Sequence, residues 1–169
     1  MKKTVLLGAL FLVVAVLVMG SAQKDKRTKT ADHDINGELD GTYTFVMLPN
    51  GTTPYDVDTL GVASGQVKGL GQTSIFTIHR PTTEGTVIDG HVWIVAANGD
   101  KIKGTFVGTT EWDSKLNKLV GKADWVIMGG TGRFANASGI ISTTAFVTML
   151  GFDVWEWPAT WVLEGTISY

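Results

Sequence analysis

Short runs of apolar residues, many alternating with polar ones, follow one another along most of the chain between glycines and polar turns. They predict strands over 43–48, 60–70, 73–80, 86–97, 101–110, 119–128, 139–149 and 159–168. Apart from the N-terminal apolar run, no segment has a convincing helical period. About eight strands, with no helix to cover a sheet, favour a sandwich or a closed barrel.

Asn98-Gly99 is the strongest turn signal in the chain. It predicts a two-residue hairpin, because both central positions of that turn require a positive φ. This register pairs Trp93 with Gly104 and His91 with Phe106. Bulky side chains then collect on one face, which we take to be the inward face.

The following hairpin is expected to place Gly104 between Trp93 and Trp125. A glycine between two tryptophans suits a small, tightly curved barrel. The last predicted strand agrees, since Trp161 and every second residue after it share one face. The prediction is an all-β fold, an eight-stranded antiparallel barrel of calycin-like form.

The N-terminus reads as a signal peptide over residues 1–22. Lys2 and Lys3 precede an apolar run over 5–19, and small residues follow at 20–22. The run is shorter than a spanning helix requires, although an uncleaved anchor is the alternative. We therefore expect a secreted or periplasmic protein of bacterial type, with no stable membrane insertion after cleavage.

Residues 23–40 are expected to form a polar, disordered linker, and residues 41–169 a single barrel domain. Nine of the eighteen linker residues are charged, which leaves little to bury. Without Lys2 and Lys3 the chain has 12 basic and 16 acidic residues, a net charge near −4. This balance argues against a nucleic-acid partner. The chain has no cysteine, which excludes disulfides and a cysteine nucleophile.

Asp89 and His91 are weak candidates for catalysis. With the register above they share the inward face with Trp93, where an imidazole and a carboxylate could exchange protons. The simpler interpretation is a buried histidine that is hydrogen-bonded to a neighbouring residue, with Asp89 in water near the rim. His79 would pair with His91 around a turn at Gly85, but that register points Phe76 outward, so no metal and no cofactor is predicted.

Six tryptophans are many for this length. Trp155 and Trp157 fall in a connection between strands, where they could cover a barrel mouth, fold back over the core or touch a partner. The predicted ligand-binding residues are Trp93, Phe106, Trp125, His91 and Trp161.

The segment from Gly129 to Phe134 reads Gly-Gly-Thr-Gly-Arg-Phe and continues as Ala-Asn-Ala-Ser-Gly to Gly139. It resembles the Gly-Gly-Thr-Gly-x-Phe…Ala-x-Gly segment of dirigent proteins and of the related allene oxide cyclase barrels. The resemblance implies an eight-stranded antiparallel barrel whose interior can hold a hydrophobic small molecule, where some members guide ring closure or radical coupling. We expect the residues of this motif to serve the architecture, with a phenyl ring closing one barrel end; they are Gly129, Gly130, Gly132, Phe134 and Gly139.

The chain departs from the dirigent pattern at two positions. Ser138 stands where dirigent proteins usually carry an arginine, and Ala135 where they carry another basic residue. We therefore expect a barrel that binds a hydrophobic small molecule or serves as a non-catalytic module, with oligomerisation left open. The alternative function is a cofactor-free cyclase or isomerase, which could promote ring closure by orienting its substrate. A surface-adhesive role through Trp155 and Trp157 is a third.

Overall fold

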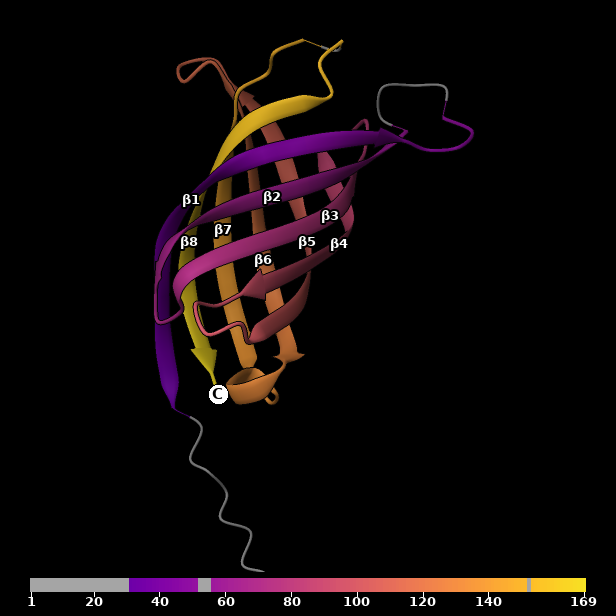
Figure 1. The fold of residues 1–169 in the computed structure, drawn as a ribbon. Helices are drawn as coiled ribbons and strands as arrows, with labels where there is room; N and C mark the ends of the chain where they lie inside the picture. Colours follow the sequence, from indigo (N-terminus) through magenta and orange to yellow (C-terminus); the bar gives the residue numbers. More distant parts are fainter. Residues whose placement is uncertain (1–30, 52–55, 152) are drawn as a thin grey trace, which may run out of the picture.

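The computed structural model describes residues 31–51, 56–151 and 153–169, which form a closed eight-stranded barrel (Figure 1). Neighbouring strands are antiparallel, and β1 pairs with β8 to close the ring. This confirms the predicted fold class. In the described residues, no helix is long and apolar enough to cross a membrane. The elements are β1 (Asp32–Met47), β2 (Val57–Lys68), β3 (Gly71–Pro81), β4 (Thr86–Val95), β5 (Lys101–Asp113), β6 (Lys118–Gly130), the 3-10 helix η1 (Gly132–Phe134), β7 (Ser138–Val147) and β8 (Glu156–Ser168).

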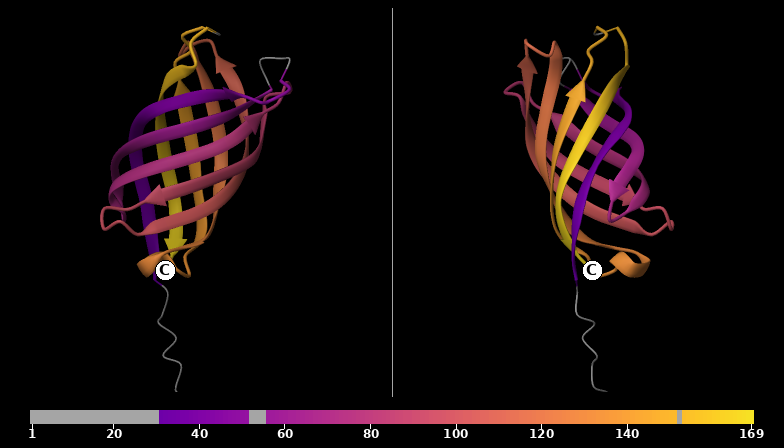
Figure 2. Two further views of the ribbon diagram at one scale, coloured as in Figure 1. Left: turned by 45° about the vertical axis from the view of Figure 1, so that its right-hand side comes forward. Right: turned by 90° about the vertical axis from the view of Figure 1, so that its left-hand side faces the viewer.

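The strands run up and down in chain order, so the two ends of the barrel are built from different loops. The C-terminus and η1 lie at the lower end (Figures 1 and 2). The connections after β2, β4 and β6 belong to this end, and those after β1, β3, β5 and β7 belong to the upper end. Strands β1–β4 cross the front of Figure 1 obliquely, because strands must tilt to close a barrel.

The lower half of the barrel is packed solid. Inward positions there are mostly isoleucine and leucine, whose branched side chains fill the narrow interior. Trp125 and Trp161 lie above this layer and are almost fully buried. The other large side chains with almost no exposure are Ile35, Leu39, Leu70, Ile75, Ile94, Ile102, Phe134, Ile141, Leu163 and Ile167.

Strand β1 begins earlier than the sequence suggested, so the predicted linker 23–40 is wrong over its last residues. Asp32 already pairs with Ser168 of β8. The charged residues of this stretch alternate with inward ones, and Ile35 and Leu39 are buried in the core. The high charge count obscured this alternation, because every second side chain of a strand can remain in water. The predicted signal peptide and the first part of the linker lie outside the described residues.

The hairpin between β4 and β5 has a three-residue loop, not the predicted two-residue loop. The Gly99 amide donates to Ala96 O and the Ala96 amide donates to Asp100 O, at 2.9 Å each. Only Gly99 in this loop has a positive φ, of 83°. This is the geometry of a type I turn followed by a left-handed residue.

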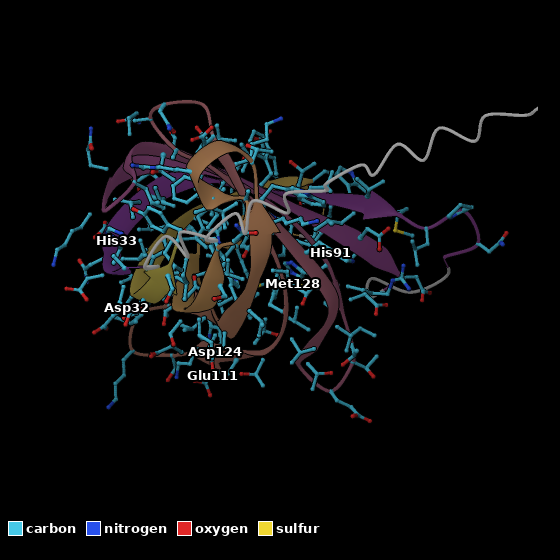
Figure 3. The ribbon with its side chains drawn as sticks, turned by 90° about the horizontal axis from the view of Figure 1, so that it is seen from below. Asp32, His33, His91, Glu111, Asp124 and Met128 are labelled. Atoms are coloured by element: carbon cyan, nitrogen blue, oxygen red, sulfur yellow. The ribbon has the colours of Figure 1, made fainter. Side chains whose placement is uncertain are left out.

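The extra loop residue shifts the pairing by one position and exchanges the two faces of β4. Trp93 pairs with Lys103, and His91 with Thr105, on the outer surface. The predicted inward orientation of Asp89, His91 and Trp93 is therefore wrong. Figure 3 shows the polar and charged side chains that surround the barrel, His91 among them.

The glycine segment after β6 closes the lower end of the barrel. Phe134 in η1 is fully buried and meets the Tyr169 ring edge-on, with centroids 4.6 Å apart. Gly132 has a φ of +52°. A Cβ on Gly130 would lie 1.9 Å from the carbonyl oxygen of Lys101, so any side chain there would push β6 away from β5.

Replacing Gly130 with alanine is expected to destabilise the barrel by about 3 kcal/mol, since the new methyl group meets backbone atoms that cannot turn aside. Gly121→Ala is the matched control on the same strand, where a Cβ would have its closest neighbour at 3.8 Å. Urea unfolding followed by tryptophan fluorescence measures both. Equal unfolding midpoints for the two variants would contradict the proposed close approach.

Candidate functional site

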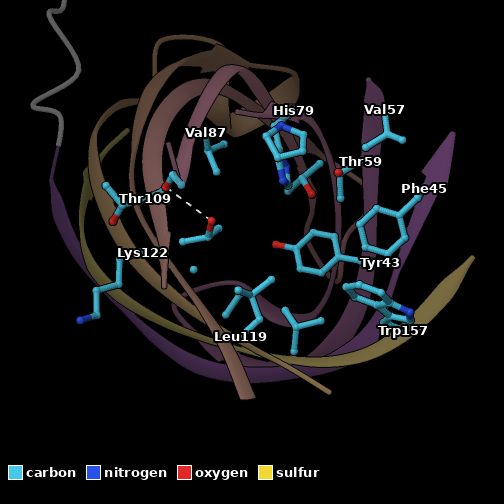
Figure 4. A pocket seen from close by; sticks show the side chains of 18 of the residues that line it. Tyr43, Phe45, Val57, Thr59, His79, Val87, Thr109, Leu119, Lys122 and Trp157 are labelled. Atoms are coloured by element: carbon cyan, nitrogen blue, oxygen red, sulfur yellow. Dashed lines mark hydrogen bonds between the residues drawn. The ribbon is translucent and has the colours of Figure 1, made fainter. Parts of the chain in front are cut away.

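The upper half of the barrel contains a cavity of about 610 Å³. Aromatic and aliphatic side chains form most of its wall, and residues of the upper loops surround its mouth (Figure 4). Trp125 and Trp161 form its floor, above the packed lower core. Its aromatic lining consists of Tyr43, Phe45, His79, Phe106, Trp125, Trp155, Trp157 and Trp161.

The cavity is open because small residues occupy inward positions of the upper half. Thr77 on β3, Ala123 on β6 and Ala145 on β7 line it where the lower half of the same strands carries Ile75, Ile127 and Ile141. Because the ring is closed, neighbouring strands cannot move inward to fill the space that these short side chains leave.

Tyr43 of β1 points into the cavity (Figure 4). Its phenol oxygen accepts a hydrogen bond from the Trp161 indole N–H at 3.1 Å, and the two rings lie 4.7 Å apart. Burial raises the pKa of Tyr43, and the Trp161 hydrogen bond opposes this shift. The phenol therefore stays protonated and keeps a hydrogen to donate. A Cβ on Gly61 would lie 2.8 Å from the Tyr43 ring and 2.3 Å from Thr77 Oγ1, so this glycine allows both side chains their positions.

His79 of β3 is the buried imidazole of the site, with 8% exposure. Burial lowers its pKa to about 4, and the charge of Asp58 opposes part of this shift. The ring is therefore neutral at pH 7. It meets the rings of Tyr43 and Phe106 at angles, with centroid distances of 5.6 Å and 5.7 Å. Its Nδ1 atom is buried without a hydrogen-bond partner among the described residues.

Three threonine hydroxyls of the cavity share this condition. The Oγ1 atoms of Thr59, Thr77 and Thr143 are buried, and within the described part of the chain they have no hydrogen-bond partner. Thr59 of β2 lies directly across from His79 of β3, and Thr77 lies two residues before His79 on the same face. We call Thr59, Thr77 and His79 the β2–β3 polar patch. Buried polar groups are normally paired, so the patch is suited to hydrogen bonding with a guest.

Three of the predicted ligand-binding residues line the cavity, namely Phe106, Trp125 and Trp161. The other two do not. Trp93 is 43% exposed on the outer face, and His91 lies on that face 6.0 Å from the Trp93 ring. The proposed acid–base pair of Asp89 and His91 is therefore absent from the cavity, and both residues border an open groove on the outside of β4–β6.

Sequence reasoning missed the polar side of the site. His79 was placed by the assumption that Phe76 faces inward, but Phe76 is 45% exposed and His79 is inside. The available signal for the inward face of this strand was the threonine and isoleucine that alternate at every second position before His79. Nothing in the sequence marked Tyr43 or Thr143.

Trp155 and Trp157 both line the upper part of the cavity. Trp155 is half exposed, whereas Trp157 is buried, and its indole N–H donates to Gly151 O at 3.2 Å. The Trp157 ring packs against Phe45 with centroids 4.5 Å apart. Two of the alternatives given for this pair are therefore realised. Trp155 lies at the barrel mouth, and Trp157 folds back over the core.

The described residues contain no group of three or more histidine, aspartate or glutamate side chains that could hold a metal ion. His79 and His91 lie on opposite faces of the barrel wall, since His91 pairs with Ile78 on the outer face. The side chains that line the cavity can supply hydrogen bonds and a neutral imidazole.

Stability is expected to fall as the pH drops below 6.5 because of His79. The unfolded chain binds a proton near pH 6.5 that the folded barrel takes up only near pH 4. This difference corresponds to about 3 kcal/mol lost across that window and to no change above it. The free energy of unfolding in urea, measured at about pH 7.5 and about pH 4.5, should therefore change less in His79→Gln than in the unmodified protein. His91→Gln is the surface control, and an unaltered change in His79→Gln would argue against the burial effect.

No protein-family model and no curated protein sequence matches this chain. Among solved structures, the barrel is similar to a pterocarpan synthase dirigent protein. The TM-score is 0.49 and the sequence identity is 14%, with 82% of this chain and 86% of that chain covered. Membership of the dirigent and allene oxide cyclase superfamily, read from the glycine segment, stays a prediction.

Proposed function

We propose that this protein binds a hydrophobic small molecule in the upper cavity of its barrel. The observation that carries the proposal is a cavity of about 610 Å³ with a largely apolar wall and four buried polar atoms that have no partner among the described residues. Such a combination is typical of ligand pockets, which lie mostly between about 300 and 1,000 Å³. A rigid module without a ligand would gain nothing from leaving this space unfilled.

The expected driving force is the removal of apolar ligand surface from water. Each 100 Å² of apolar surface buried contributes roughly 2.5 kcal/mol, and aromatic walls add stacking contacts. Phe45, Phe106 and Trp157 offer ring faces and edges of this kind in the cavity wall. With the predicted signal peptide over 1–22, we place this binding outside the cytoplasm.

A cofactor-free cyclase or isomerase is the alternative, favoured by one observation. The neutral imidazole of His79 and the protonated phenol of Tyr43 face the same cavity, with ring centroids 5.6 Å apart. An imidazole base and a phenol acid around an enclosed substrate can support proton transfer, and enclosure favours ring closure.

The binding proposal predicts that filling the cavity weakens binding. Ala145→Phe introduces a ring into the cavity, and affinity for the neutral fluorescent probe N-phenyl-naphthylamine is expected to drop at least about tenfold, since the ligand loses its space. Val107→Phe, on the outer face, is the matched control. Circular dichroism checks that both variants fold. Undiminished probe binding in Ala145→Phe would refute this cavity as the site.

The two functions are separated by the fate of the ligand. Native mass spectrometry of protein purified from its own host is expected to detect a bound apolar molecule, and incubation should return it unchanged. Conversion into an isomer at a rate that falls about tenfold in His79→Gln, but not in His91→Gln, would instead establish the cyclase or isomerase. The absence of both a bound molecule and probe binding would remove the binding proposal.

A further inference from the structure

We infer that the ligand of this cavity is an uncharged, ring-containing molecule whose hydroxyl or carbonyl group is held by the β2–β3 polar patch. The inference rests on the proposed binding function and narrows it to a chemical class. It depends on three properties of the cavity: its charge, the position of its polar atoms and the shape of its apolar wall.

The part of the cavity wall that the structure describes offers no unpaired charge to a ligand. Of the described residues that line it, Lys122 is the one with a permanently charged side chain. That side chain is 59% exposed and pairs with Glu111 at 3.2 Å, and Figure 4 shows it directed away from the opening. His79 is neutral because it is buried. A carboxylate or ammonium ligand would lose its hydration without gaining an opposite charge.

The unpaired polar atoms lie mainly together on one wall. Thr59 and His79 are cross-strand partners, and Thr77 points the same way as His79 about 7 Å along β3. Threonine hydroxyls donate and accept, and imidazole Nδ1 does either according to its tautomer. The phenol of Tyr43, on the next strand beyond β2, adds a donor. A ligand hydroxyl or carbonyl near this wall can therefore be hydrogen-bonded.

The remaining wall is suited to flat rings. Phe45 of β1, Phe106 of β5, and Trp157 and Trp161 of β8 approach the space from three strands, and small residues on β6 and β7 leave room between them. Thr143 of β7 lies four strands from β3 in the eight-stranded ring, on the opposite side. A second polar group on the ligand would find a partner there.

Three probes of one skeleton test the chemical class: pyrene, pyrenemethanol and pyrenecarboxylate. Energy transfer from tryptophan to the pyrene ring measures each dissociation constant at about pH 7.5, where the carboxylate is ionised. Pyrenemethanol is expected to bind about tenfold more tightly than pyrene, which corresponds to one or two net hydrogen bonds. Pyrenecarboxylate is expected to bind at least about tenfold more weakly than pyrene, because its charge is not compensated.

Removing the patch hydroxyls tests where the polar group lies. The double variant Thr59→Val, Thr77→Val is expected to bind pyrenemethanol and pyrene equally, with pyrene itself no weaker than before. Thr105→Val, on the exposed outer face, is the control and should keep the tenfold preference. If the double variant does not fold, the ranking of the three probes on the unmodified protein decides alone.

The outcomes separate this inference from the binding proposal. Binding of pyrene with no preference for the alcohol, or with the carboxylate bound most tightly, would overturn the inference while leaving the cavity as a binding site. A preference for the alcohol that survives the loss of both hydroxyls would overturn the assignment to the threonine hydroxyls of the β2–β3 polar patch. Failure of all three probes would overturn the binding function and the inference together.

Discussion

The pairing of β1 with β8 is the constraint on which the rest of this structure depends. From Asp32 opposite Ser168 to Thr44 opposite Glu156, this seam leaves no open sheet edge between the first and last strands. Closure also fixes how much space the inward side chains must fill, because the strands cannot approach one another across the ring. Side-chain size at alternate positions therefore decides which part of the barrel is solid and which part is hollow.

The two halves of the barrel resolve this constraint differently. The lower half fills its interior with isoleucine and leucine, and Phe134 closes its end. The upper half places threonine and alanine at the equivalent positions, so a cavity remains above Trp125 and Trp161. Unfilled space and unpaired buried hydroxyls both cost stability, and the packed lower half allows the barrel to tolerate them. The cavity is thus a local departure from good packing, as expected of a binding site.

The site was predictable where one strand carries the information and unpredictable where two strands must be aligned. Trp161 was identified from alternation alone, and Phe106 and Trp125 from predicted registers that differ from the observed pairing but leave both residues on the inward face. Trp93 and His91 were assigned to the wrong face, because one additional residue in the loop at Gly99 exchanges the two faces of β4. An inward His79 was not expected because it requires Phe76 to point outward, and the sequence alone does not show that this phenylalanine is exposed. Sequence alternation defines two faces but does not say which of them meets the core.

The sequence by itself determined the number and order of the strands, the all-β class and the inward face of the last strand, because these follow from a period of two within single segments. Its glycine segment also indicated an architectural role, which agrees with the close approach of backbones at Gly130. The tertiary structure alone decided where β1 begins, which face of β4 is inward and how the cavity is built. Tyr43 and Trp161 are 118 positions apart, and their contact exists because closure brings β1 beside β8. The neutrality of His79 has the same origin, since its burial comes from residues on other strands and not from its own neighbours in the chain.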